Sequence, residues 1–361
     1  MVGGSTVFAV GSTTSQIWDG AAALGGTDAL AVGYSTAGAY QTTNRFGSNQ
    51  NEAAFAAAGN ATHLLAAGLT TGTIDGQAGF GGTDAFLSKR DSSGALVWTR
   101  VVGTISSDSG RAAAFDGAGN AYLAGYTAAS AFGSNDLFVA RYDASGNRTL
   151  LKQWGSIGSD TAYDVEVDGS GNIYLTGYTD GALGGQTNSG GNDAFLIKLD
   201  SSGNVLWTRL LGGTGADFSK GLALDAAGRV WIGGYSNSPT FAGHTNAGSN
   251  DAFVAQYDSA GTLLNTAFWS TTGDDLITGM AAAPDGSVSV SGYTSGTLGA
   301  ANAGDYDAFA ASLTTVPEPT TAALLLGSGA LLLLRRRRAA GRKGQARHGP
   351  GVTSPVSRPM M

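Results

Sequence analysis

The chain has 361 residues, of which 58 are glycine and only 13% are charged, a turn-rich composition typical of β-sheet proteins rather than helical ones. Residues 1–316 carry 12 Lys and Arg against 26 Asp and Glu (net −14), whereas residues 317–361 carry 8 against 1 (net +7). The acidic body excludes nucleic acid as a partner, and the absence of cysteine excludes disulfides, thiolate metal sites and cysteine nucleophiles.

The first predicted strand, residues 4–13, matches the last strand of the repeat units that follow, such as residues 286–294. The repeats end at residues 307–314 with what is the first strand of a unit. We therefore expect the two ends to contribute strands to one shared sheet, which would close a ring without exposed edges. Met1 is not followed by a basic region and an apolar stretch, so we expect the natural start, with a signal peptide and at least two strands, to lie upstream.

Between these ends, the tripeptide Asp-Ala-Phe or a close variant recurs at spacings of 56, 52, 57, 58 and 56 residues. Its aspartates are Asp28, Asp84, Asp136, Asp193, Asp251 and Asp307. A Gly-Tyr-Thr marker follows the second to fifth of them after a constant 41 residues, which predicts a fixed strand register within each unit. The length variation falls in the Gly- and Asn-rich connectors between units, so we expect exposed loops there, where ligands would bind.

The fourth unit shows the expected strands most clearly, as apolar runs at residues 194–199, 205–211, 221–224 and 230–235 separated by Gly-containing turns. This pattern predicts a four-stranded antiparallel meander. Such a sheet cannot cover both of its faces alone, and units of this length favour a β-propeller over a solenoid. The predicted fold of residues 1–315 is therefore an all-β propeller of about six four-stranded blades, five of them complete.

The aspartates of the Asp-Ala-Phe tripeptides form a first column of acidic residues. A second acidic column lies 24 residues after it and consists of Glu52, Asp108, Asp160, Asp217 and Asp275. Carboxylates repeated around a ring could bind Ca²⁺ together with backbone carbonyls. The candidate ligands are Asp84, Asp108, Asp136, Asp160, Asp193, Asp217, Asp251 and Asp275. The chain lacks an Asp-x-Asp-x-Asp-Gly loop, so we expect these acids to accept backbone N–H bonds in turns and expect no cofactor.

Three further sets of residues have a structural and a functional interpretation. Asp91, Asp143, Asp200 and Asp258 each precede a glycine by three residues, which is a turn pattern. Trp98, Trp154, Trp207 and Trp269 lie on or near the second strand of a unit; they would stack on sugars if exposed, but we expect them to pack between blades. His63 and His244 have no neighbours that suggest a triad or a metal cluster. No catalytic site is visible, so we expect the protein not to be an enzyme.

After residue 315 the sequence changes to Val316, Pro317, Glu318 and Pro319, an apolar run, and then Arg335, Arg336, Arg337 and Arg338. Residues 320–334 would form a helix of about 22 Å, short of the roughly 30 Å hydrocarbon core. The arginines favour a cytoplasmic location for its far end. Residues 339–361 are rich in Gly, Pro, Arg and Ser and are expected to be a disordered basic tail.

Two resemblances follow from these motifs. Residues 193–213 and 224–235 resemble the bacterial SBBP-type β-propeller repeat. Residues 316–338 resemble the PEP-CTERM sorting signal, which implies processing by an exosortase-type membrane protease and an association with extracellular polysaccharide and biofilm. An ordinary C-terminal anchor is the alternative for this segment.

Together these features predict an exported, non-catalytic propeller of a Gram-negative bacterium. It would be anchored in the inner membrane as an intermediate and then act as a structural or polysaccharide-binding component of the cell surface or matrix. The alternative is a polysaccharide-acting lyase or hydrolase that uses propeller carboxylates.

Overall fold

The computed structural model describes residues 2–3, 6–15, 17–18, 21–129, 132–299, 302–313 and 332–334. These residues form 28 strands and no helix. Twenty-four strands make six four-stranded sheets, and two short hairpins account for the rest.

Each sheet combines four strands that lie close together in the chain. The first sheet contains β1 (Val2–Gly3), β2 (Thr6–Thr13), β5 (Asp28–Ser35) and β6 (Tyr40–Phe46). The second contains β7 (Glu52–Gly59), β8 (His63–Thr70), β9 (Asp84–Asp91) and β10 (Leu96–Val102). The third contains β11 (Asp108–Phe115), β12 (Ala121–Thr127), β13 (Asp136–Tyr142) and β14 (Arg148–Trp154). The fourth contains β15 (Asp160–Val167), β16 (Ile173–Thr179), β17 (Asp193–Leu199) and β18 (Val205–Leu211). The fifth contains β19 (Asp217–Leu224), β20 (Val230–Ser236), β23 (Asp251–Tyr257) and β24 (Leu263–Trp269). The sixth contains β25 (Asp275–Ala282), β26 (Val288–Thr294), β27 (Asp307–Leu313) and β28 (Leu332–Leu334). The hairpins are β3 (Ile17–Trp18) with β4 (Ala21–Ala22) and β21 (Thr240–Phe241) with β22 (His244–Thr245).

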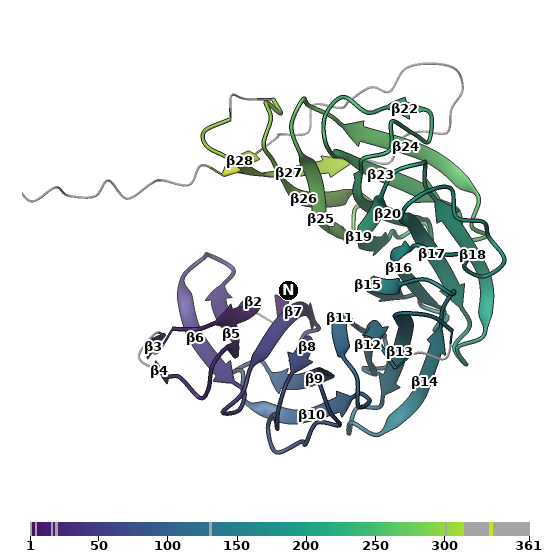
Figure 1. The fold of residues 1–361 in the computed structure, drawn as a ribbon. Coiled ribbons are helices and arrows are strands. Elements are labelled where there is room, and N and C mark those ends of the chain that lie inside the picture. The colour runs from purple at the N-terminus through teal and green to yellow at the C-terminus, as the bar shows by residue number, and fades with distance from the viewer. Residues whose placement is uncertain are drawn as a thin grey trace, which may run out of the picture.

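The six sheets follow one another around an arc, with β7, β11, β15, β19 and β25 innermost (Figure 1). Strands within each sheet pair antiparallel. The predicted all-β propeller of four-stranded blades is therefore confirmed, and it has six blades.

The blade boundary differs from the predicted repeat unit. The unit that begins at Asp193 contributes β17 and β18 to the fourth sheet, but its next two strands, β19 and β20, belong to the fifth. The repeat and the blade are thus offset by two strands. A series of antiparallel strands has the same sequence pattern wherever the chain passes from one sheet to the next. The spacing of the repeats therefore does not show which connection joins two sheets.

The predicted sharing of one sheet by the two ends is also wrong. β2 pairs with β1 and β5, whereas β27 pairs with β26 and β28, and the arc remains open between the first and sixth sheets (Figure 1). A free strand edge pairs readily with an extended segment. Here β1 pairs with β2 in the first sheet, and β28 pairs with β27 in the sixth.

Burial of the second strand in each sheet follows its position in the arc. In β16, which has a neighbouring sheet on each side, five consecutive residues from Ile173 are buried. In β26 of the last sheet, Val288 and Val290 are buried while Ser289 and Ser291 are exposed. Alternation is expected where only one face of a sheet is covered, and continuous apolar runs where both are.

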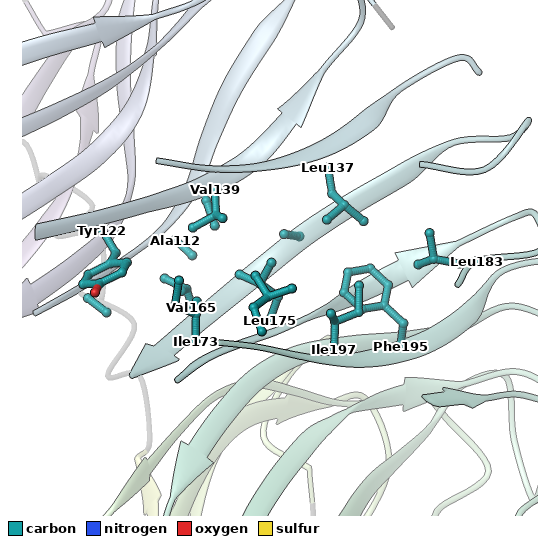
Figure 2. Packing of buried hydrophobic residues seen from close by; sticks show 14 residues of the cluster. Ala112, Tyr122, Leu137, Val139, Val165, Ile173, Leu175, Leu183, Phe195 and Ile197 are labelled. Carbon is teal, nitrogen blue, oxygen red and sulfur yellow. The ribbon is translucent and has the colours of Figure 1, made fainter. Parts of the chain in front are cut away.

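Apolar side chains fill the space between neighbouring sheets. Figure 2 shows the layer between the third and fourth sheets, where Leu137 and Val139 pack with Leu175 and Phe195. All four are fully buried. Layers of this kind supply the apolar burial that a single blade cannot provide.

The predicted sorting signal and basic tail, residues 316–361, lie outside the described residues apart from β28. At Leu332–Leu334 the structure has a strand in place of the end of the predicted apolar helix, because the outer edge of β27 is open to pairing. Within the described parts of the chain, no helix has the length and apolar character needed to cross a membrane.

Candidate functional site

The first acidic column closes the connectors that lead into the third strand of each sheet. Each aspartate accepts the backbone N–H of the residue four positions earlier, at 2.7–3.2 Å. The donors are Leu24, Phe80, Phe132, Ser189, Ala247 and Ala303. This is the predicted role of these acids.

The second acidic column begins the innermost strands and closes the links between sheets in the same way. Its carboxylates accept the N–H four residues earlier at 2.5–2.7 Å. Its backbone N–H groups also donate to the residue preceding the first-column acid, as in Asp217 N–H to the Asn192 carbonyl at 2.7 Å. The two columns therefore meet on one rim, which we call the connector rim.

The third set of aspartates lies on the opposite rim, the turn rim. Asp200 Oδ1 accepts the N–H groups of Ser202 and Asn204 at 2.9 and 2.8 Å, and Gly203 adopts φ +78°. Asp91, Asp143 and Asp258 make the same pair of bonds. The turn interpretation is confirmed.

The tryptophans pack between blades, as predicted. Trp98 is buried and its Nε1 donates to the Ala144 carbonyl of the next sheet at 3.1 Å. Arg100, two residues on, donates from Nε to the Gly146 carbonyl at 2.7 Å. Trp207 and Arg209 bind the turn of the fifth sheet in the same way, and Trp154 and Trp269 are partly buried against the cores.

The histidines are individually satisfied. His63 Nδ1 lies 2.7 Å from Thr62 Oγ1. His244 stacks on Phe268 and its Nε2 lies 2.9 Å from Asp251 Oδ2. Across the described ranges, no three His, Asp or Glu side chains gather as a metal cluster.

A set of residues that the sequence analysis missed lines the inner strands. β7, β11, β15, β19 and β25 each contain a register shift three residues after the second-column acid. A bulge re-aims the side chain at the extra residue. The extra residues are Phe55, Arg111, Tyr163, Lys220 and Thr278.

Four of these residues form two neighbouring groups of cations and aromatic rings, one around Arg111 and one around Lys220. Lys220 Nζ lies 3.2 Å from the Tyr163 ring centre, and Arg111 Cζ lies 4.4 Å from that of Phe55. The rings of Tyr178, Phe218 and Tyr235 join them, with successive centres 5.0 and 5.1 Å apart. We call this group, with Tyr126 beside Arg111, the inner band; it consists of Phe55, Arg111, Tyr126, Tyr163, Tyr178, Phe218, Lys220 and Tyr235.

The inner band is positively charged within an acidic body. No described carboxylate lies within ion-pair distance of Arg111 or Lys220. Burial, together with the nearby Arg111 guanidinium, lowers the pKa of Lys220 to about 7. Both basic side chains are half-buried rather than covered. An anion that reached them would meet the Arg111 guanidinium and, below about pH 7, a second positive group at Lys220.

Two carboxyl groups on β15 have the largest shifts among the acids. Burial raises the pKa of Asp164 to about 7, although its Oδ2 accepts the Leu222 N–H of β19 at 2.8 Å. Burial, and then the Asp164 carboxyl, raise the pKa of Glu166 to about 8. Perturbed groups of this kind are typical of functional sites but also occur in structural networks.

One signal in the sequence could have identified the inner band. The position three residues after the second-column acid is aromatic or basic in four of five units, at Phe55, Arg111, Tyr163 and Lys220. Their convergence depends on the bulges, however, and the register of the inner strands is not visible in the spacing.

Comparison with known proteins finds a family match for part of the repeat region. A sequence model of the family described as "SBBP: Beta-propeller repeat" matches residues 152–190 and 206–239. These two segments are similar to the SBBP propeller repeat. They include parts of the fourth and fifth sheets, where Tyr163, Tyr178, Lys220 and Asp217 lie.

Two curated relatives align with part of the chain. The regulatory protein FlaEY of Caulobacter vibrioides is 29% identical over 147 residues, 36% of this chain. An uncharacterized WD repeat-containing protein of Acanthamoeba polyphaga mimivirus is 24% identical over 224 residues, 47% of this chain. The aligned parts cover only 15% and 16% of those proteins.

Solved structures with related shapes are distant. A Bacteroides caccae protein of unknown function has a TM-score of 0.44 at 8% identity, covering 72% of this chain and 78% of its own. The Pan2 WD40 domain of Neurospora crassa has 0.44 at 12%, covering 73% and 71%. A Xanthomonas campestris gluconolactonase has 0.36 at 14%, covering 63% and 68%.

The shifted carboxyl groups of β15 predict a pH-dependent stability. Because the pKa values of Asp164 and Glu166 are higher in the folded than in the unfolded state, the folded state favours their protonated forms. The free energy of unfolding should therefore fall as pH rises from about 4 to about 8. Asp164→Asn with Glu166→Gln should flatten this slope, measured by urea unfolding at several pH values.

Asp200→Asn is the matched control, because the N–H and side-chain bonds from Asn204 lower the pKa of Asp200 and remove it from this pH window. An identical slope in the wild type and the double variant would contradict the assignment.

Proposed function

We propose that this protein is an exported, non-catalytic propeller of the cell surface or extracellular matrix that binds an acidic polysaccharide at its inner band. The single observation that carries the binding proposal is that Arg111 and Lys220 face aromatic rings and no described carboxylate neutralises them. Aromatic faces pack on sugar rings, and a guanidinium forms paired hydrogen bonds with a carboxylate.

The connectors on the same side of the blades would provide specificity. Tyr178 and Tyr235 are the next-to-last residues of β16 and β20, close to the connectors that follow these strands. These connectors differ in length between blades, and variable loops on a rigid scaffold are the usual place for recognition. A chain of sugars could therefore contact the inner band and several connectors together.

Export and processing are supported by the sequence of the tail. The Pro-Glu-Pro motif at 317–319, the apolar run and the arginines at 335–338 together resemble an exosortase-type sorting signal. A surface or matrix location also matches the proposed polysaccharide ligand.

The binding proposal predicts which side chains matter. Arg111→Ala with Lys220→Ala should weaken binding of the purified full chain to alginate and polygalacturonate by at least about tenfold, since two charge-assisted contacts are lost. Binding should also weaken with added salt. Titration calorimetry or glycan arrays would measure both effects.

Lys198→Ala is the matched control, because Lys198 Nζ lies 5.1 Å from the Tyr174 ring centre but donates to Ser259 in a turn-rim loop. Equal binding of neutral dextran, or an unchanged affinity in the double variant, would refute binding at the inner band.

The sorting proposal predicts a processing defect. Replacing Pro317, Glu318 and Pro319 by alanine should leave the chain in the membrane fraction of a Gram-negative host that has an exosortase, whereas the wild type should lose its tail and leave that fraction. Mass spectrometry of the mature protein would find the cleavage. Pro350→Ala, in the same tail, should be processed normally; wild-type processing of the triple variant would rule out the motif.

A second candidate function is cleavage of the same polysaccharide. The observation that favours it is the pair of raised pKa values at Asp164 and Glu166, which allow a carboxylic acid to donate a proton near neutral pH. If so, Glu166→Gln should reduce the release of reducing ends or unsaturated products by about 100-fold or more. Asp200→Asn should have no effect, and a wild type that binds without any turnover would eliminate this function.

A further inference from the structure

The two acidic columns meet in pairs wherever one sheet passes to the next, and these five pairs are not equivalent. Each pair contains a first-column acid and the second-column acid 24 residues later, and all ten side chains are buried. The pairs, numbered along the chain as junctions one to five, are Asp28 with Glu52, Asp84 with Asp108, Asp136 with Asp160, Asp193 with Asp217, and Asp251 with Asp275.

Each junction therefore places two carboxylates away from water. A buried charge is costly unless it is paired, hydrogen-bonded or bound to a metal ion. The backbone N–H bonds described above satisfy one oxygen of each acid. At junctions two and four, the other oxygen of the first-column acid, Oδ1 of Asp84 or Asp193, has no hydrogen-bond partner in the described structure.

These two oxygens lie against the link between the sheets. Asp84 Oδ1 occupies the place that a Cβ on Gly103 would take, and Asp193 Oδ1 does the same at Gly212. Both glycines belong to the link that leads to the second-column acid of the same junction. Asp108 Oδ1 is likewise buried without a partner.

The remaining junctions contain a donor from the chain itself. At junction one, Arg45 Nε lies 3.5 Å from Asp28 Oδ2, with both side chains buried. At junction five, His244 Nε2 lies 2.9 Å from Asp251 Oδ2. Oδ1 is unpartnered in Asp28 and Asp251 as well, but a basic side chain already lies at the second oxygen of both acids. At junction three, Gln153 Nε2 donates to Asp136 Oδ2 at 3.0 Å.

Junctions two and four have no arginine, histidine or glutamine side chain at either acid among the described residues. At junction four, the N–H and hydroxyl of Ser189 bind Asp193. The Gly213 N–H and the hydroxyls of Ser236 and Ser238 bind Asp217. No basic group contacts either acid there, nor at junction two. Burial, and then the neighbouring acid, raise the pKa values of Asp84 and Asp193.

We propose that junctions two and four each bind one divalent cation, with Ca²⁺ as the preferred ion, between the carboxylates of Asp84 and Asp108 and between those of Asp193 and Asp217. Ca²⁺ accepts carboxylate oxygens together with backbone carbonyls and waters in flexible geometry. Two carboxylates per site, with no third acidic or histidine ligand among the described residues, correspond to a weak site with Kd on the order of 10⁻⁴ M. The ion would tie the second sheet to the third and the fourth to the fifth.

The test is calcium titration of the full chain after treatment with EDTA, followed by calorimetry and thermal unfolding. We expect two sites per chain and a rise in Tm with added Ca²⁺, because the ion binds only the folded state. Asp84→Asn and Asp193→Asn should each remove one site, and the double variant should lose both sites and the Tm response.

Asp251→Asn is the matched control, since His244 already serves junction five, and this variant should retain both sites. If a junction variant fails to fold, luminescence of Tb³⁺ displaced by Ca²⁺ from the wild type provides the stoichiometry without substitution. A wild type whose Tm does not respond to millimolar Ca²⁺, or a double variant that still binds two ions, would overturn the proposal. So would stability that depends on pH alone, because the pairs would then be neutralised by protons.

Discussion

A short backbone hydrogen bond at the connector rim links each blade to the next. In each case the N–H of the second-column acid donates to the carbonyl of the residue before the first-column acid, at 2.7–2.8 Å. The carboxylates on either side hold the two connecting segments in the conformation that this bond requires. The first residue of each of these innermost strands is therefore held at a fixed position relative to the preceding sheet. As a result, the bulges that carry the inner band lie side by side.

Much of the fold could be predicted because side-chain periodicity and spacing are properties of the sequence. The constant interval from Asp193 to Gly234 determines the register of β17 to β20, and the structure has the predicted strands there. The blade boundary and the separation of the two ends could not be predicted, since both depend on which strand edges meet in space. The alternation of Val and Ser in β26, where Ser289 and Ser291 are exposed, is the one sequence signal of a sheet with a single covered face. This signal becomes evident when β26 is compared with the second strands of the other blades.

The candidate site was less accessible to sequence analysis than the fold. The N–H-accepting role of Asp200 follows from its distance to Gly203, because a turn of this kind is local. Lys220 and Tyr163 are 57 residues apart in sequence, and their contact requires the stacking of two sheets and a bulge in each. The same limit applies to the junction acids: a constant interval of 24 residues brings them together, but only the structure shows which pairs have an Arg or His beside them.

The hydrogen bonds from Trp98 and Arg100 to the turn of the following sheet have an evolutionary and a mechanical consequence. Such contacts connect each blade only to its neighbours, so the stability of the array is close to a sum over adjacent interfaces. Duplication or loss of a whole repeat then preserves every remaining interface. Among the described residues, the first and sixth sheets each have one neighbouring sheet instead of two. Under load or heat these two sheets should therefore open first, and the central four should melt last.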